Sequence, residues 1–224
     1  MTQSHVSPFA RRLLAPLLLA ASLISGVAGG AISTARGAEN TGCVSTNYGD
    51  GFNIGCSAEQ TWNYSISQIK APAAWSRGFA GAGVTVALFD SGIDTGDNQF
   101  IGRISPTPGY DATTNTYGVT TDDMWHGTFV AGIIAADRDG TGMTGVAFNA
   151  QLLPIRIVNP DGSITLSDAQ LAKAITYAIG SGAKVFNNSW NSSTPISQLP
   201  ASFLASYMPQ TLSAYQAAVK AGAI

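Results

Sequence analysis

From about residue 67 onward, strand-like and helix-like segments alternate along the chain. Residues 84–89 (VTVALF) form a short run of β-branched and apolar side chains, which is typical of a strand buried on both faces. Further strands are predicted at residues 152–158 and 183–187, each after a helix-like segment. Because parallel neighbours require crossover connections, the alternation predicts an α/β fold with three layers, in which a mainly parallel sheet carries helices on both faces.

Capping residues, glycines and apolar spacing mark the predicted helices. Residues 127–136 are rich in small side chains suited to close packing. Residues 167–170 (SDAQ) form a capping box, and Gly182 ends the helix that follows. The expected apolar stripe of that helix consists of Leu171, Ala174, Ile175, Ala178 and Ile179. A last helix is predicted at residues 211–220, before residues 221–224 enter another strand. Its expected apolar face consists of Leu212, Tyr215 and Val219.

The first 35 residues carry the features of a secretory signal peptide. Arg11 and Arg12 form a positive flank, and an apolar run extends from Leu13 to about Ala31. The run is nearly long enough to span a bilayer, so an uncleaved membrane anchor is the alternative. Its glycine-rich second half and its small-residue exit favour a cleaved signal, and we therefore expect export.

Residues 36–66 are predicted to form an N-terminal extension that contains both cysteines of the chain. Cys43 and Cys56 flank a stretch rich in glycine, asparagine and tyrosine. In an exported protein two nearby cysteines most often form a disulfide, and closing such a loop contributes on the order of 3 kcal/mol by chain entropy. A reactive thiol is the alternative, but no histidine lies nearby in the sequence to activate it.

Charge and composition exclude several classes of protein. The formal net charge is −2 and 11% of the residues are charged, so nothing predicts a basic surface for nucleic acid. With 45% hydrophobic residues and a small net charge, the chain is not expected to be disordered. Membrane contact is expected only through the export signal or through a C-terminal translocation domain outside this sequence.

Two side chains in the α/β region are suited to acid–base chemistry. Asp90 directly follows the strand predicted at residues 84–89, and open α/β sheets place their functional crevice at the carboxyl ends of strands. For this carboxylate alone, an Asx-turn or a helix cap is the alternative interpretation. His126 stands at the head of the helix predicted at residues 127–136. The chain's other histidine is His5, so processing would leave His126 as the one imidazole for general base catalysis near neutral pH.

Three segments containing or following these residues resemble the subtilisin-like serine proteases, the subtilase family. Residues 86–94 (VALFDSGID) match the family's acid segment, close to V-A-V-hydrophobic-D-[ST]-G-[IV]-D, with one aromatic substitution. Residues 126–132 (HGTFVAG) match its H-G-T-H-V-A-G segment, with Phe129 replacing the second, non-catalytic histidine. Residues 187–191 (NNSWN) resemble the N-x-S-x-G strand end that lines the substrate cleft. The resemblance covers about residues 67–224.

The resemblance implies a subtilisin-like fold and peptide-bond hydrolysis by an Asp-His-Ser triad. Asp90 is expected to hold the His126 imidazole in one tautomer and to stabilise its charged form. His126 is expected to take the proton from a serine hydroxyl and to pass it to the leaving amine. The expected peptide-binding residues are Asn188, Ser189, Trp190 and Asn191, where Asn191 stands in place of the family's glycine. The chemistry requires no cofactor.

The family's nucleophile segment, G-T-S-[MA]-A, and its oxyanion-hole segment, A-A-G-N, do not occur in these 224 residues. The sequence therefore predicts that residues 67–224 are the N-terminal part of a peptidase domain whose sheet is incomplete at the C-terminus, and that this chain alone is inactive. The alternative is a non-catalytic pseudo-protease or a peptide-binding fragment. The sequence of residues 169–190 is similar to that of the passenger proteases of bacterial autotransporters. This resemblance implies that the protein is located in the periplasm, at the outer membrane or in the extracellular space.

Two further patterns suggest nucleotide binding and metal binding. Residues 140–145 (GTGMTG) spell the dinucleotide fingerprint G-x-G-x-x-G, but they follow a predicted helix and lead to a strand, so nucleotide binding is a remote alternative. Eight of the thirteen acidic residues lie between Asp90 and Asp139. Relatives often bind Ca²⁺, but no EF-hand spacing is present and no metal ligands are assigned. Solvated surface loops are the better interpretation of these acids.

Overall fold

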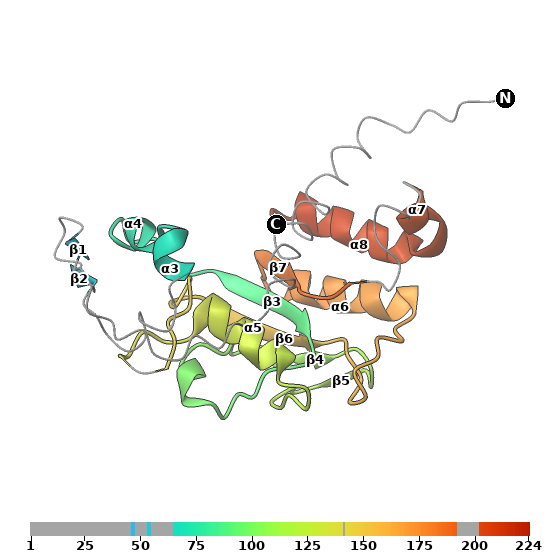
Figure 1. The fold of residues 1–224 in the computed structure, drawn as a ribbon. Coiled ribbons are helices and arrows are strands. Elements are labelled where there is room, and N and C mark those ends of the chain that lie inside the picture. The colour runs from blue at the N-terminus through green and yellow to red at the C-terminus, as the bar shows by residue number, and fades with distance from the viewer. Residues whose placement is uncertain (1–45, 48–52, 55–64, 141, 192–201) are drawn as a thin grey trace.

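The computed structural model describes residues 46–47, 53–54, 65–140, 142–191 and 202–224. A five-stranded sheet of order β5-β4-β6-β3-β7 forms its centre (Figure 1). The strands are β3 (Thr85–Asp90), β4 (Tyr110–Asp111), β5 (Thr116–Tyr117), β6 (Gln151–Arg156) and β7 (Val185–Asn188). All neighbouring strands are parallel except β4 and β5, which pair antiparallel. The predicted mainly parallel sheet is therefore confirmed.

Helices cover both faces of this sheet, which confirms the predicted three-layer α/β arrangement (Figure 1). On one face α5 (His126–Ala135) packs with alternate strand residues such as Leu88 and Leu152. On the other face α6 (Asp168–Gly180) and α8 (Pro209–Lys220) pack with residues such as Phe89 and Ile155. Since side chains alternate across a strand, these two sets of residues define the two core layers.

Shorter elements complete the described part of the chain. They are β1 (Thr46–Asn47), β2 (Asn53–Ile54), α3 (Ser65–Gln68), α4 (Ala71–Trp75), η1 (Asn98–Phe100) and α7 (Phe203–Tyr207). The first two strands form an antiparallel pair within the predicted N-terminal extension. The proposed signal at residues 1–35 and both Cys43 and Cys56 lie outside the described residues. Within the described ranges, none of the helices combines the length and the apolarity needed to cross a bilayer.

Local sequence signals place α6 correctly. Ser167 accepts a hydrogen bond from the Gln170 backbone N–H, and the Gln170 side chain accepts one from the Ser167 backbone N–H, so the predicted capping box is present. Gly182 has φ +79° just beyond the helix, the left-handed geometry that glycine adopts most easily. Of the predicted apolar stripe, only Ile179 is not fully buried.

The predicted apolar face of α8 is only partly right, because Tyr215 packs against the core but Val219 does not. The buried residues of α8 are Thr211, Ala214 and Ala218, whereas Val219 is 48% exposed. The Asp168 carboxylate at the start of α6 accepts hydrogen bonds from the backbone N–H groups of Gln210 and Thr211. These bonds hold the first turn of α8 against α6, and a close approach of two helices favours small side chains at the contact.

The end of the chain lies beside the edge strand β7. The Ile224 backbone N–H donates to the Lys184 carbonyl at 2.9 Å, and the Ile224 carbonyl accepts from the Phe186 N–H at 2.8 Å. This pairing is what the sequence predicts for residues that leave a helix and enter a further strand. Residues 140–145 lie between α5 and β6, as expected from the sequence, and not in the strand–helix turn that a dinucleotide site requires.

Gly145 provides a test of how closely the loop between α5 and β6 packs. A Cβ atom at Gly145 would lie 2.5 Å from the backbone Cα and N atoms of Ala135. Gly145→Ala is therefore expected to lower the free energy of unfolding by about 1–3 kcal/mol. Gly180→Ala is the matched control, because a Cβ atom there meets nothing within 4 Å. It is expected to be neutral or to stabilise by up to about 1 kcal/mol in urea denaturation. Equal losses in both variants would contradict the packing argument.

Candidate active site

Asp90 and His126, 36 residues apart, meet at the carboxyl end of β3. Asp90 is the last residue of β3 and is 2% exposed, and His126 is the first residue of α5. The His126 Nδ1 atom lies 2.7 Å from Asp90 Oδ1. Because a carboxylate only accepts hydrogen bonds, this contact places a proton on Nδ1 and leaves Nε2 as the basic nitrogen of the neutral ring. The predicted pair of acid and base is thus brought together.

The surroundings of the two side chains differ in the way that a general base requires. The Asp90 Oδ1 atom also accepts hydrogen bonds from the Ser91 backbone N–H at 2.7 Å and from the Ser91 hydroxyl at 3.2 Å. The His126 side chain, in contrast, is 55% exposed. A buried, fixed carboxylate therefore orients an imidazole whose other nitrogen is open to a reacting group.

Glycine at position 127 allows α5 to begin this close to β3. The Gly127 backbone N–H donates to the Ser91 hydroxyl at 2.9 Å. A Cβ atom at Gly127 would lie 2.1 Å from the Gly92 carbonyl oxygen and 3.1 Å from Asp90 Oδ1. Any larger residue would push the helix away from the strand and lengthen the contact between Asp90 and His126.

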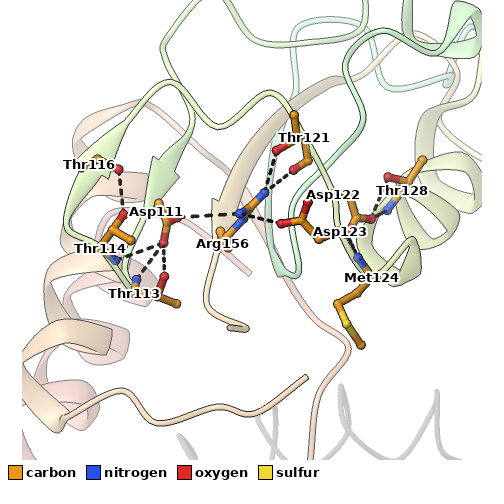
Figure 2. Close-up of polar contacts among 10 residues, drawn as sticks. All are labelled: Asp111, Thr113, Thr114, Thr116, Thr121, Asp122, Asp123, Met124, Thr128 and Arg156. Carbon is orange, nitrogen blue, oxygen red and sulfur yellow. Dashed lines mark hydrogen bonds and ion pairs between the residues drawn. The ribbon is translucent and has the colours of Figure 1, made fainter. Parts of the chain in front are cut away.

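Asp122 caps α5 from outside the helix. The N-cap residue Trp125 is left-handed, with φ +62°, and its side chain makes no capping hydrogen bond. The Asp122 carboxylate instead accepts from the Thr128 backbone N–H at 2.8 Å, from the Thr128 hydroxyl at 2.7 Å and from the Met124 N–H at 3.1 Å (Figure 2). Burial alone raises the pKa of Asp122, but the hydrogen bonds that its carboxylate accepts outweigh it and hold the pKa below its ordinary value.

The expectation that the acidic residues form solvated loops is wrong for Asp90, Asp111 and Asp122, which are 2%, 9% and 6% exposed. Ser91 and Asp122 are the site residues that sequence reasoning missed. The usual capping signal is a short polar residue immediately before the helix, whereas Asp122 precedes His126 by four positions. Its role depends on the path of the intervening loop.

The predicted peptide-binding residues lie at the end of β7. Asn188 and Trp190 among them contact the rest of the protein closely. Asn188 pairs in register with Phe89, so this segment lies beside the end of β3 that carries Asp90. The Asn188 Oδ1 atom accepts from Trp190 Nε1 at 3.3 Å and from the Tyr215 hydroxyl at 2.9 Å. Burial raises the pKa of that Tyr215 hydroxyl.

Among the other predicted peptide-binding residues, Ser189 accepts from the Asn187 amide at 2.9 Å, and Trp190 packs against the core. Asn191 is exposed. Within the described parts of the chain, no three histidine, cysteine, aspartate or glutamate side chains gather as a set of metal ligands.

Comparison with known proteins matches this chain to subtilisin-type proteases. The sequence profile of the Subtilase family matches residues 81–224. An alkaline protease of Alkalihalobacillus alcalophilus is 38% identical over 141 residues, which cover 62% of this chain and 35% of that protein. Subtilisin BL of Lederbergia lenta is 37% identical over 141 residues, which cover 62% of this chain and 49% of that protein.

The solved structure of MycP1 with its N-terminal propeptide removed superposes with a TM-score of 0.56 at 27% identity, over 72% of this chain and 46% of that one. The chain thus spans about half or less of the length of these relatives.

The cap by Asp122 predicts a specific pH dependence. Asp122→Asn is expected to lower the free energy of unfolding at pH 7 by about 1–3 kcal/mol, because it removes the charge from several hydrogen bonds. Since the folded pKa is lowered, the stabilisation is complete above the unfolded pKa of about 3.9 and is lost as the pH falls through the folded value. The difference between the two proteins should therefore shrink in acid. Urea denaturation of the wild type and of Asp122→Asn, at pH 7 and in acid, measures this difference.

Asp123→Asn is the matched control for this prediction, because its carboxylate is 55% exposed. It should cost less than about 1 kcal/mol at pH 7. A difference between the wild type and Asp122→Asn that stays constant with pH would contradict the assignment.

Proposed function

Since the chain belongs to the subtilase family, we propose that it supplies the acid and the base of an Asp-His-Ser triad that hydrolyses peptide bonds in polypeptide substrates. The observation that carries the proposal is the 2.7 Å contact between buried Asp90 and exposed His126. The site needs no metal and no cofactor for this chemistry. Asp90 and His126 are its catalytic residues.

The geometry suits His126 to move a proton twice. Its Nε2 atom accepts the proton of a serine hydroxyl as that oxygen attacks the scissile carbonyl, and it then gives the proton to the leaving amine. The imidazolium that forms between these steps faces the Asp90 carboxylate, which stabilises the positive charge in a buried setting. Asp90 takes up no proton in either step.

The serine nucleophile is proposed to come from polypeptide outside these 224 residues. Ser91, the serine that touches the site, has its hydroxyl engaged with Asp90 Oδ1 and with the Gly127 N–H. No G-T-S segment of the family type occurs in the sequence. A second function, a pseudo-protease that binds peptides without cutting them, is favoured by the same missing segment.

Peptide binding is proposed for residues 188–191, next to the end of β3. The Asn188 side chain is held by Trp190 and Tyr215, so the contribution of this segment to a peptide would come mainly from its backbone. Support for this proposal is the position of the segment on the same sheet edge as Asp90. Asn191 is polar and exposed at the end of the segment.

Export is proposed from residues 1–35, which carry a basic pair followed by an apolar run. A disulfide between Cys43 and Cys56 is proposed for the exported form, since oxidising compartments retain such bonds. Delivery to the bacterial periplasm, the outer membrane or the outside, by an autotransporter route, follows from the resemblance of residues 169–190 alone.

The chain by itself is expected to show no peptidase activity. Incubated with a fluorophosphonate probe, it should remain unlabelled, because the reagent requires an activated serine. Gel fluorescence of the wild type and of His126→Ala should be equal. Labelling of the wild type that disappears in His126→Ala would show that a serine of this chain completes the triad.

Activity is expected when the chain is joined to the sequence that follows codon 224 in its gene. Asp90→Asn should then lower kcat for a peptide substrate about 10⁴-fold, because the imidazole loses the partner that fixes its tautomer, and His126→Ala should be at least as damaging. His5→Gln is the matched histidine control and should leave kcat unchanged. A stop codon at position 225, or full activity without His126, would favour the non-catalytic alternative.

A further inference from the structure

Arg156 lies on the sheet edge that carries the candidate site, one strand away from Asp90. It is the last residue of β6 and pairs in register with Asp90 of β3 on one side and with Asp111 of β4 on the other. Its side chain is only 13% exposed. A partly buried guanidinium needs hydrogen-bond partners, and Figure 2 shows it reaching across to the loop before α5.

The guanidinium contacts that loop at Thr121 and at Asp123, the residues on either side of Asp122. Its Nη2 atom donates to the Thr121 carbonyl oxygen at 2.5 Å and to the Thr121 hydroxyl at 3.1 Å. Its Nη1 atom lies 3.4 Å from Asp123 Oδ2. The planar fork of arginine can serve these two neighbouring positions at once, which a lysine ammonium cannot do in the same way.

The other side of the cluster is fixed to the sheet. Arg156 Nη1 lies 4.0 Å from Asp111 Oδ2. The Asp111 Oδ1 atom accepts from the Thr113 backbone N–H at 2.8 Å and from the Thr113 hydroxyl at 2.6 Å, which ties it to the turn between β4 and β5 (Figure 2). Arg156 thus connects a rigid sheet edge to the loop that carries Asp122.

That loop determines where α5 begins. Asp122 caps the helix through Thr128 and forms an antiparallel bridge with Gly92, directly after β3. The contact is so close that a Cβ atom at Gly92 would lie 2.3 Å from the Thr121 carbonyl oxygen, the same oxygen that Arg156 holds. A shift of residues 121–123 would therefore shift the first turn of α5, including His126.

We infer that Arg156 is a positioning residue for the general base: by holding Thr121 and Asp123 it sets the place of Asp122, and through the first turn of α5 it keeps His126 in hydrogen-bond contact with Asp90. This inference rests on the proposed function, which makes His126 the base. An ordinary stabilising ion pair would affect the free energy of unfolding but would leave the hydrogen bond of the folded protein unchanged. The two roles are separable by a spectroscopic signature.

The test uses the full chain with ¹⁵N-labelled histidine in a His5→Gln background, so that His126 is the one imidazole observed. NMR reports the Nδ1 proton, its exchange with water and the tautomer of the ring. In Arg156→Gln we expect this proton to exchange about tenfold faster, as loss of one charge-assisted hydrogen bond allows, with a mixture of the two tautomers. Arg156→Lys should restore the signal only in part, because it lacks the fork.

Arg103→Gln is the matched control. Arg103 is also a partly buried arginine whose Nη1 atom holds a loop carbonyl, that of Phe148, at 2.9 Å. It should leave the His126 signal as in the wild type, whatever it does to stability. If Arg156→Gln does not fold, Asp123→Asn takes its place, because this exposed carboxylate anchors the loop without supporting the core, and it should also speed exchange.

The outcomes separate this inference from the proposed function. Asp90→Asn is measured alongside: if it leaves the Nδ1 proton unchanged, then Asp90 and His126 are not paired and the proposed function itself is wrong. If Asp90→Asn abolishes the signal while Arg156→Gln and Asp123→Asn leave it intact, then only the role of Arg156 is overturned. An equal effect of Arg103→Gln would likewise overturn it, by showing a general loosening.

Discussion

The hydrogen bond between Asp90 and His126 is the constraint on which the rest of this site depends. It joins the end of a central strand to the start of a helix, and it requires a buried carboxylate to lie 2.7 Å from a half-exposed imidazole. A shift of about 1 Å would break it. Strand end and helix start therefore have to be fixed separately, and the neighbouring residues provide this fixation.

Close backbone packing at Gly92 and Gly127 fixes the end of β3, and the Asp122 carboxylate fixes the start of α5. Gly127 lets α5 begin close to β3, because a Cβ atom there would lie 2.1 Å from the Gly92 carbonyl oxygen. Gly92 lets the preceding loop approach, because a Cβ atom there would lie 2.3 Å from the Thr121 carbonyl oxygen. The N-cap residue Trp125 is left-handed and makes no side-chain capping bond. Asp122 replaces it from the preceding loop, and its lowered pKa reflects the number of hydrogen bonds it accepts there.

The features that could be predicted from the sequence are those with local signals. The apolar run before Asp90, the capping box at Ser167 and the segment around His126 each carry their information within a few residues. The buried face of α8 could not be predicted, because it depends on how closely α6 approaches and not on which residues are most apolar. The capping role of Asp122 and the contacts of Arg156 depend on strand register and on a loop path, which no short stretch of sequence encodes.

Register explains why charged groups gather on one edge of a sheet whose interior is apolar. Parallel pairing places Asp111, Arg156 and Asp90 at the same level, where the strands end and the backbone turns away. The guanidinium lies between the carboxylates of Asp111 and Asp123: Asp111 belongs to the scaffold, and Asp123 to the loop before α5. With a neutral residue at position 156, the mostly buried Asp111 carboxylate would lose its counter-charge, and the loop would lose its bonds to Thr121 and Asp123. The sheet edge therefore needs a cation at this position for the carboxylate at position 90 to meet its histidine.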